Sequence, residues 1–306
     1  MRVFITGATG FVGSNISRHM LDAGHEVHIL IRKKSDTWRI DDIKDQITPH
    51  FSDISDKNGL LNAMSVAKPE IVYHTATYGG FPHQTDFNKT VQTNIVGVIN
   101  LIQACVDNGV ECLVNTGTSS EYGICDGPMR EDMVLNPLSM YGATKATASV
   151  ILKNTDKLPI VTLRLFSPFG FYEDNKRLIP YLILSYMRNM QPKLSSKNFV
   201  RDFIFIEDVM KSYEKASDPN LGGNIFNIGT GKQHTILDVV SFIKNCTKSR
   251  IDPIWDSVQQ RKNEPKNWFA DTTKSKKILK WHPKHSLEYG IKKTIEWFRL
   301  NSKFYM

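Results

Sequence analysis

The sequence has few cysteines, and their spacing predicts no covalent or metal framework. Cys105, Cys112, Cys125 and Cys246 form no C-x-x-C pair. Neither a zinc site nor a disulfide scaffold is therefore predicted. We expect reduced thiols and no bound metal.

Long apolar runs, internal repeats and low-complexity stretches are also missing. No stretch approaches the ~18 consecutive apolar residues of a membrane-spanning helix, and the N-terminal residues lead into a strand-like segment rather than a signal peptide. A mean hydropathy of -0.31 with 41% hydrophobic and 23% charged residues is typical of a globular protein and excludes disordered chains. We expect no membrane partner and a cytoplasmic location.

Acidic residues are outnumbered only moderately by basic ones. The 39 Lys and Arg against 31 Asp and Glu give a formal net charge of +8. Such a balance permits binding of nucleic acid, an anionic membrane or a small polyanion. The late lysines between Lys274 and Lys284 are typical of a solvated helix face. We therefore expect no nucleic-acid partner.

Short apolar runs such as 3–5 alternate with longer amphipathic segments such as 11–23 and 91–105 through the first two-thirds of the chain. This alternation predicts βαβ crossovers and a Rossmann-type, doubly wound parallel sheet of the α/β class. Shorter pieces rich in Pro and Gly follow. We predict a Rossmann domain over 1–166 and a smaller substrate-binding lobe over 167–306, with some segments returning to the first domain. The segment 286–300 predicts an amphipathic helix that closes the lobe.

A glycine-rich motif lies between the first strand and the first helix. Gly7 allows a tight turn, Gly10 lets the backbone approach a pyrophosphate, and Gly13 allows close packing of helix on strand. The helix N-terminus favours the phosphate charge. The motif predicts dinucleotide binding, with contacts from Gly7, Thr9, Gly10, Phe11, Val12 and Gly13.

The end of the second strand bears on the choice of dinucleotide. An acid there would accept a hydrogen bond from the ribose 2′-hydroxyl of NAD, but Ile31 is followed by Arg32 and two lysines. The predicted cofactor is NAD(P), with NADP(H) favoured because these cations suit a 2′-phosphate. Asp36 could still reach the ribose. Asp53 and Ile54, after the third strand, are candidates for the adenine edge.

A phenol and an ammonium lie one helical turn apart in the segment Tyr141 to Lys145. A nearby Lys lowers the pKa of a tyrosine, so the phenol can give or take a proton at a sugar hydroxyl or carbonyl. Upstream, the strand 112–115 leads into a hydroxyl-rich turn at the sheet edge where ligands of such folds bind. A hydroxyl in that turn can hold the reacting oxygen.

These motifs, in this order, resemble the extended short-chain dehydrogenase/reductase family in its nucleotide-sugar epimerase, dehydratase and reductase branch. The resemblance covers nearly the whole chain. It includes His74-Thr75-Ala76, Asn94, Arg164 to Gly170, Arg201-Asp202-Phe203, Asn227-Ile228-Gly229 and Arg261 to Pro265.

The resemblance implies roles for individual residues. Tyr141 corresponds to the general acid/base, Thr118 to its hydroxyl partner with Ser119 as the runner-up, and Lys145 to the residue that binds the nicotinamide ribose. The implied cofactor site also includes Thr75, Ala76 and Asn94. The implied substrate is a nucleoside-diphosphate sugar, held by Thr118, Ser119, Tyr78, Ser167, Arg201, Arg261 and Glu264.

Three of these substrate contacts have a chemical reason, and one departs from the family pattern. The guanidinium groups of Arg201 and Arg261 suit a pyrophosphate, and Glu264 can accept hydrogen bonds from ribose hydroxyls. Ser167 stands where an Asn is common in the family. The resemblance also implies a homodimer formed through two helices.

The family's 4,6-dehydratases carry an Asp-Glu pair directly after the Thr, and here Ser119 and Ser120 occupy those positions. Dehydration is therefore disfavoured. We expect reduction of a 4-keto nucleotide sugar, or the reverse C4 dehydrogenation. The alternative is a 4-epimerase that keeps its NAD tightly bound. A remote alternative is a non-catalytic protein on this fold that senses dinucleotides or binds RNA.

Overall fold

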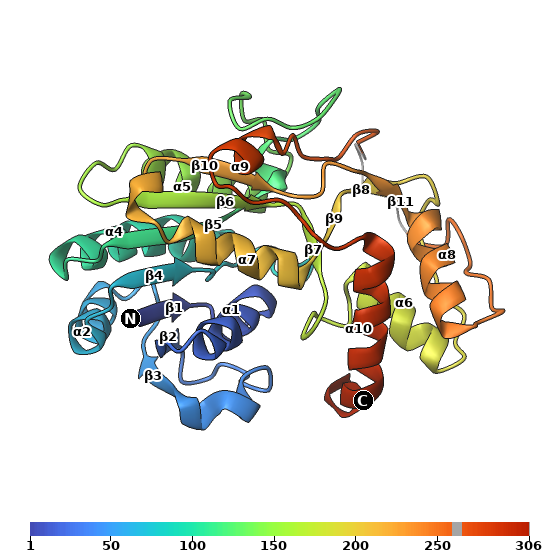
Figure 1. Ribbon diagram of the computed structural model, residues 1–306, viewed down its shortest axis with the longest axis horizontal. Coiled ribbons are helices and arrows are strands. Elements are labelled where there is room, and N and C mark those ends of the chain that lie inside the picture. The colour runs from blue at the N-terminus through green and yellow to red at the C-terminus, as the bar shows by residue number, and fades with distance from the viewer. Residues whose placement is uncertain (259–264, 306) are drawn as a thin grey trace.

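The computed structural model describes residues 1–258 and 265–305. A parallel sheet covered by helices fills one side of the molecule in Figure 1, and a group of helices fills the other. The strands are β1 (Arg2–Thr6), β2 (Glu26–Ile31), β3 (Ile47–Phe51), β4 (Ile71–His74), β5 (Cys112–Thr118), β6 (Ile160–Leu165), β7 (Ser167–Phe169), β8 (Val200–Arg201), β9 (Phe203–Phe205), β10 (Ile225–Ile228) and β11 (His234–Thr235).

The helices alternate with the strands over the first half of the chain. The α-helices are α1 (Phe11–Asp22), α2 (Lys57–Ala67), α3 (Phe87–Val91), α4 (Gly97–Asp107), α5 (Met140–Lys153), α6 (Leu178–Met187), α7 (Ile206–Ala216), α8 (Ile236–Thr247), α9 (Thr273–Lys277) and α10 (Leu287–Asn301). A π-helical segment, η2 (Gln92–Val96), joins α3 to α4. The short 3₁₀ turns are η1 (Asp41–Gln46), η3 (Ser119–Glu121), η4 (Pro219–Leu221) and η5 (Ser302–Tyr305).

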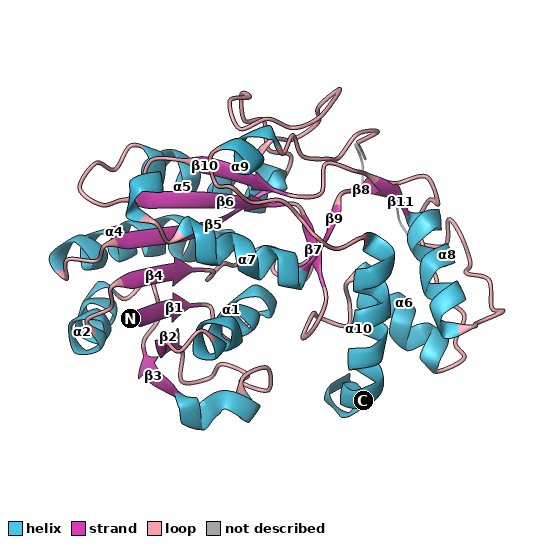
Figure 2. Ribbon diagram, viewed as in Figure 1, coloured by secondary structure: helices cyan, strands magenta, loops and turns pink. Residues whose placement is uncertain are grey.

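The large sheet has seven parallel strands in the order β3-β2-β1-β4-β5-β6-β10. The order reverses between β1 and β4, which is the switch point where ligands of doubly wound sheets bind. Figure 2 shows the strands stacked between helices. The predicted Rossmann-type fold is confirmed.

Both faces of the sheet are buried, and successive residues of a strand serve opposite faces. Val3 and Ile5 of β1 pack in one apolar cluster with residues of α1 and α7, whereas Phe4 packs in another with residues of α2, α4 and α5. In Figure 1, α1 and α7 accordingly lie on one face and the other three helices on the opposite face. Burial on both faces explains why these strands are nearly continuous apolar runs.

The chain leaves the sheet after β6 and later returns to it. α7 packs on the sheet, and β10 pairs with β6 through Ile225 and Thr162. The helices α6, α8 and α10 pack on one another, and the short pairs β7–β9 and β8–β11 lie beside them. The carboxyl-terminal helices therefore form a group beside the sheet, while β10 completes it.

Two elements differ from the sequence-based prediction. β5 continues to Thr118, so the first part of the hydroxyl-rich segment is strand and the turn is η3. The single helix expected over 91–105 has a π-helical turn at η2, a feature that is frequent at functional sites. The closing helix agrees with expectation, because the Ser286 side chain accepts a hydrogen bond from the Tyr289 N–H at the start of α10.

The carboxyl-terminal turn η5 contacts the loop that follows β2. The rings of Trp38 and Tyr305 lie edge to face with centroids 5.3 Å apart. In the same loop, Arg39 donates from Nε to the Tyr172 carbonyl over 2.7 Å and from a terminal nitrogen to the Thr9 carbonyl over 3.4 Å. Arg39 thus ties this loop to the glycine-rich turn.

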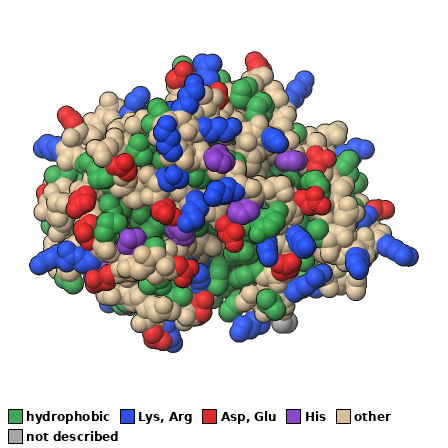
Figure 3. Space-filling view, viewed as in Figure 1, with side chains coloured by type: hydrophobic (Ala, Val, Ile, Leu, Met, Phe, Trp, Pro, Cys, Tyr) green, Lys and Arg blue, Asp and Glu red, His purple; other side chains and the backbone are tan. Residues whose placement is uncertain are grey.

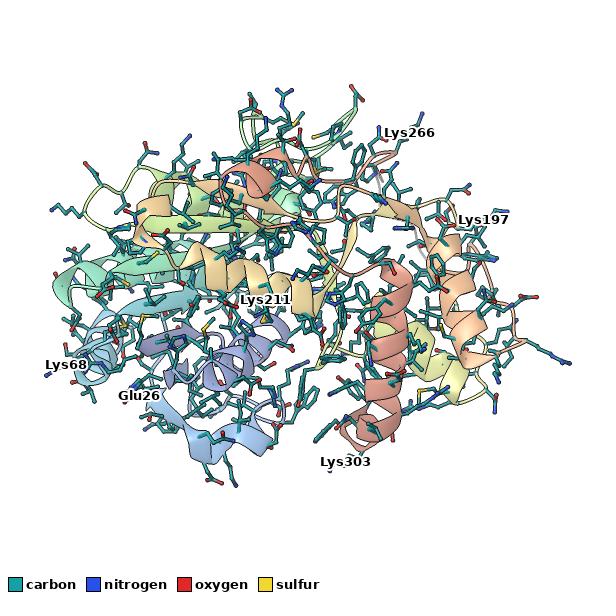
Figure 4. The ribbon with its side chains drawn as sticks, in the orientation of Figure 1. Glu26, Lys68, Lys197, Lys211, Lys266 and Lys303 are labelled. Atoms are coloured by element: carbon teal, nitrogen blue, oxygen red, sulfur yellow. The ribbon has the colours of Figure 1, made fainter. Side chains whose placement is uncertain are left out.

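One face of the molecule shows basic and acidic side chains mixed rather than one basic stripe (Figure 3). On the face shown in Figure 3, Lys and Arg side chains are interspersed with Asp and Glu. The lysines labelled in Figure 4, such as Lys68, Lys211 and Lys266, project from elements that lie far apart. No helix within the described residues is long and apolar enough to cross a membrane, and no group of His, Cys, Asp and Glu there could hold a metal ion.

A buried carboxylate lies between the sheet and the carboxyl-terminal helices. Glu173 is 6% exposed, and its Oε2 has no hydrogen-bond partner within the described part of the chain. Burial raises the pKa of Glu173 to about 8, although the positive Arg177 and a backbone hydrogen bond from Gly170 oppose the rise. The folded protein therefore holds this proton more tightly than the unfolded chain does.

This linkage predicts that stability falls as the pH rises from about 4.5 to about 8. Glu173→Gln mimics the protonated form of the carboxyl group. Its free energy of unfolding should therefore equal that of the wild type near the lower pH and exceed it by about 2–4 kcal/mol near the upper pH. Chemical unfolding across this range measures the difference, with the exposed Glu111→Gln as control. A parallel pH dependence in wild type and Glu173→Gln would refute the prediction.

Candidate functional site

The glycine-rich turn lies at the switch point, against the end of β4. Gly7 has a φ of +74°, and a Cβ added there would lie 2.6 Å from the Ala76 nitrogen. A Cβ on Gly13 would lie 2.2 Å from the Gly7 carbonyl oxygen. Only glycine fits either position. No side chain caps α1, which begins at Phe11 after Gly10, so its N-terminus suits a pyrophosphate.

The predicted contacts Thr75 and Ala76 are held at this turn by β1. The Thr75 hydroxyl donates to the Thr6 carbonyl over 2.7 Å, and the Ala76 N–H donates to the Thr6 hydroxyl over 3.4 Å. Thr6 also bonds to His74 Nδ1 at 2.7 Å. Together with the glycines, these residues form a cradle that fits the dinucleotide.

The tips of β2 and β3 border an open hollow of about 580 Å³. Its lining carries several positive charges and a single acid. The lining residues are Arg32, Lys33, Lys34, Phe51, Ser52, Asp53 and Lys89. Asp36 is not among them, and its carboxylate accepts a hydrogen bond from the Trp38 N–H.

The acid of this hollow, Asp53, is turned toward its own loop. Its Oδ1 accepts hydrogen bonds from the Ser55 N–H at 3.0 Å and the Ser55 hydroxyl at 2.7 Å. Burial acts to raise the pKa of Asp53, but these bonds and the positive Arg32 and Lys89 outweigh it, so the pKa is lowered. The neighbouring Ile54 is buried beneath the hollow. The net charge of the lining is positive.

Asn94 is buried at η2, and every hydrogen-bonding position of its side chain is used within the chain. Its Oδ1 accepts from the Thr77 hydroxyl and the Tyr78 N–H, and its Nδ2 donates to the Tyr78 carbonyl and the Thr144 hydroxyl over 2.8–3.0 Å. An amide has two donors and two acceptor positions. Asn94 therefore joins the Tyr78 loop to α5, and its contact with the cofactor stays a prediction.

Thr118, Tyr141 and Lys145 come together at the carboxyl edge of the sheet. Thr118 ends β5, while Tyr141 and Lys145 lie one turn apart at the start of α5. The side chains of Thr118 and Tyr141 are hydrogen-bonded. Lys145 is 3% exposed, and burial lowers its pKa to about 8.

The pKa of Tyr141 departs from expectation. Burial raises it above the ordinary value, although the hydrogen bond with Thr118 and the positive Arg177 oppose the rise. The sequence-based prediction expected Lys145 to lower this pKa. Burial reverses the direction because it disfavours the charged phenolate.

The predicted substrate contacts surround this edge. Ser119 is buried beside Thr118, and Tyr78 lies in the loop whose Gly80 approaches the Tyr141 ring. The Ser167 N–H donates to the Asp202 carbonyl at the start of the carboxyl-terminal segments. Arg201 lies on β8. Arg261 and Glu264 fall outside the described residues.

Trp268 and Arg177 also lie at the site, and the sequence-based prediction missed both. The Trp268 indole donates to the Ser119 hydroxyl over 3.1 Å, and its ring lies 5.4 Å from the Arg201 guanidinium. Arg177 donates to the Gly80 carbonyl over 2.9 Å. Trp268 closely follows the predicted substrate segment ending at Pro265, which was the available signal for it.

The chain matches the model of the NAD dependent epimerase/dehydratase family over residues 3–229. It is 28% identical to the UDP-glucose 4-epimerase of Mycolicibacterium smegmatis over 320 aligned residues, which cover 99% of this chain and 100% of that protein.

Solved structures share the fold along the whole chain. The crystal structure of UDP-glucose 4-epimerase with UDP-glucose from Thermotoga maritima has a TM-score of 0.91 at 23% identity and covers 99% of this chain and 100% of its own. The Thermus thermophilus UDP-glucose 4-epimerase complex with NAD has a TM-score of 0.88 at 25% identity, with coverages of 98% and 99%.

Proposed function

Because the chain belongs to the NAD dependent epimerase/dehydratase family, we propose that it is an NAD(P)-dependent enzyme acting at C4 of a nucleoside-diphosphate sugar. The match confirms the resemblance inferred from the motifs, and NAD(P) binding follows from it. The observation that carries the proposal is the meeting of Thr118, Tyr141 and Lys145 beside the glycine-rich cradle.

Each of the three side chains has a separate task in this proposal. The bound dinucleotide supplies or accepts the hydride at C4. Tyr141 gives or takes the proton of the C4 oxygen, and Thr118, hydrogen-bonded to Tyr141, holds the same oxygen. The Lys145 ammonium binds the ribose of the cofactor, and its positive charge favours the phenolate.

Reduction of a 4-keto sugar by NADPH is the first candidate reaction, with C4 dehydrogenation as its reverse. The hollow at the tips of β2 and β3 supports it, because four cations and one acid suit a 2′-phosphate better than a free hydroxyl. A dissociable cofactor is what a reductase requires. Arg201, Ser119, Tyr78 and Ser167 would contact the nucleotide sugar.

Epimerisation at C4 with retained NAD is the second candidate. The full-length similarity to 4-epimerases favours it. Dehydration is not proposed, because Ser119 and Ser120 replace the Asp-Glu pair and the nearby Glu121 is bound to Arg164 in a buried ion pair.

The reductase proposal predicts that purified protein releases no stoichiometric dinucleotide on denaturation and oxidises NADPH when given a 4-keto nucleotide sugar. The absorbance of the reduced nicotinamide follows the reaction, and the 4-keto sugars tested carry different nucleoside diphosphates. Tyr141→Phe should lower kcat by about 100-fold or more and leave NADPH affinity nearly unchanged, with the exposed Tyr289→Phe as control.

Two results would overturn parts of this proposal. Stoichiometric retained NAD, with sugar conversion and no net absorbance change, would establish the epimerase instead. Full turnover by Tyr141→Phe would remove the assignment of Tyr141 as general acid/base.

The basic hollow predicts a preference for NADPH that depends on Arg32. Arg32→Gln should raise the KM for NADPH by about 10-fold or more, the worth of a charge-assisted hydrogen bond, and leave the KM for NADH nearly unchanged. Initial rates with both cofactors measure this, with Arg130→Gln, exposed and away from the hollow, as control. Equal losses for the two cofactors would contradict a 2′-phosphate contact.

We further propose a homodimer, as the resemblance implies. Ile99 on α4 is 49% exposed and Val150 on the adjacent α5 is 52% exposed, so this helical face offers apolar surface to a second copy. Light scattering should give twice the 34.9 kDa chain mass. Val150→Glu should give monomers, whereas Val66→Glu on α2 should not. A monomeric wild type would refute the dimer.

A further inference from the structure

The turn after β5 contains a fully buried carboxylate that the proposed reaction does not use. Glu121 is 0% exposed, and its Oε2 accepts a hydrogen bond from Arg164 Nε over 2.8 Å. Arg164, on the neighbouring strand β6, is 2% exposed and also donates to the Tyr122 hydroxyl over 2.9 Å. A buried ion pair is costly to desolvate, so its place directly behind the catalytic edge needs a reason.

The other oxygen of Glu121 holds the backbone of Thr118. Oε1 accepts a hydrogen bond from the Thr118 N–H over 2.8 Å, while the Thr118 hydroxyl accepts one from the Ser120 N–H over 3.2 Å. The two bonds form a capping box around η3. Gly117 makes room for this arrangement, because a Cβ there would lie 2.8 Å from Oε1. The carboxylate therefore fixes the residue that is hydrogen-bonded to Tyr141.

The same turn abuts α5 between the two catalytic residues of that helix. A Cβ added to Gly142 would lie 2.6 Å from the Ser120 carbonyl oxygen. The turn that carries Glu121 therefore lies against α5, and the negative charge of Glu121 acts on both Lys145 and Tyr141. Burial lowers the pKa of Lys145 to about 8 and Glu121 opposes the fall, while Glu121 adds to the rise in the pKa of Tyr141.

Other charged or titratable groups also face this pair. His74 on β4 interacts with Lys145, but burial lowers its pKa to about 3, so it stays neutral at ordinary pH. Arg177, before α6, lowers the pKa of Tyr141. Tyr213 on α7 is affected by Tyr141, and its own pKa is raised by burial. None of these supplies a negative charge near neutral pH.

We propose that Glu121, anchored by Arg164, is a positioning residue that fixes Thr118 through its backbone and keeps the buried Lys145 protonated at neutral pH. The inference rests on the proposed use of Thr118, Tyr141 and Lys145. Without the carboxylate, the ammonium would lose its proton at lower pH, and with it the cation that binds the ribose.

Glu121→Gln tests this inference, because glutamine can still accept from the Thr118 N–H but carries no charge. The first measurement is the dissociation constant of NADPH against pH, from the fluorescence of the reduced nicotinamide. Wild-type affinity should weaken as the pH rises through about 8, and the midpoint in Glu121→Gln should lie about one pH unit lower.

The second measurement is kcat against pH. Its alkaline limb should move in the same direction, because loss of the carboxylate lowers the pKa values of both Lys145 and Tyr141. Glu111→Gln, an exposed carboxylate just before the opposite end of β5, makes the same change of charge and should leave both profiles unchanged. A uniform loss at every pH, with the wild-type midpoint, would show a merely structural role and overturn the proposal.

The single variant leaves Arg164 buried opposite a neutral side chain and can fail to fold. Glu121→Gln combined with Arg164→Gln leaves no unpaired buried charge. The same downward shift is expected there, because Glu121 acts on both Lys145 and Tyr141. An unshifted midpoint in the folded double variant would overturn the proposal. Because cofactor binding needs no sugar, a wild type that reduces no 4-keto sugar would refute the reductase candidate without deciding this inference.

Discussion

The close approach of the β1–α1 turn to the end of β4 is the contact on which the rest of the site depends. It exists because Gly7 and Gly13 carry no Cβ, so the turn comes within contact distance of Thr75 and Ala76. Thr6 then bonds to both of these residues. The turn therefore packs directly against the switch point of the sheet. A phosphate group that approaches the N-terminus of α1 meets backbone rather than side chain.

The catalytic edge is built in the opposite way, from charges buried in apolar surroundings. Lys145, Glu121 and Arg164 are each at most 3% exposed. Electrostatic interactions are strong where water is excluded, but each isolated charge there would be unfavourable. The three groups are compatible because the carboxylate is paired with Arg164 and its negative charge also acts on Lys145. The protonation state of the site therefore depends on Lys145, Glu121 and Arg164 together, and no single side chain determines it.

The sequence predicted the features that depend on local spacing. Alternating apolar runs indicated the fold class, and a single helical turn linked Tyr141 to Lys145. Which carboxyl-terminal segment returns to the sheet could not be predicted in the same way, because the return of β10 depends on pairing between Ile225 and Thr162, far apart in the chain. The direction of the Tyr141 pKa shift likewise depends on burial, which exists only after tertiary packing.

Long-range contacts also explain what sequence analysis missed at the site. Asn94 was identified by its motif, yet its hydrogen bonds to Tyr78 and Thr144 depend on tertiary packing. Trp268 reaches Ser119 across 149 positions of the chain, and no local pattern encodes that contact.

The contact between Tyr305 and Trp38 sets an order of events during synthesis. The loop after β2 belongs to the first part of the chain to leave the ribosome, but its aromatic partner is made more than 260 residues later. Arg39 joins the same loop to the glycine-rich turn and to Tyr172, so these contacts can form before the carboxyl-terminal turn is made. A nascent chain can form most of its sheet early, but the aromatic packing of the loop after β2 is completed only when the distant carboxyl-terminal turn docks.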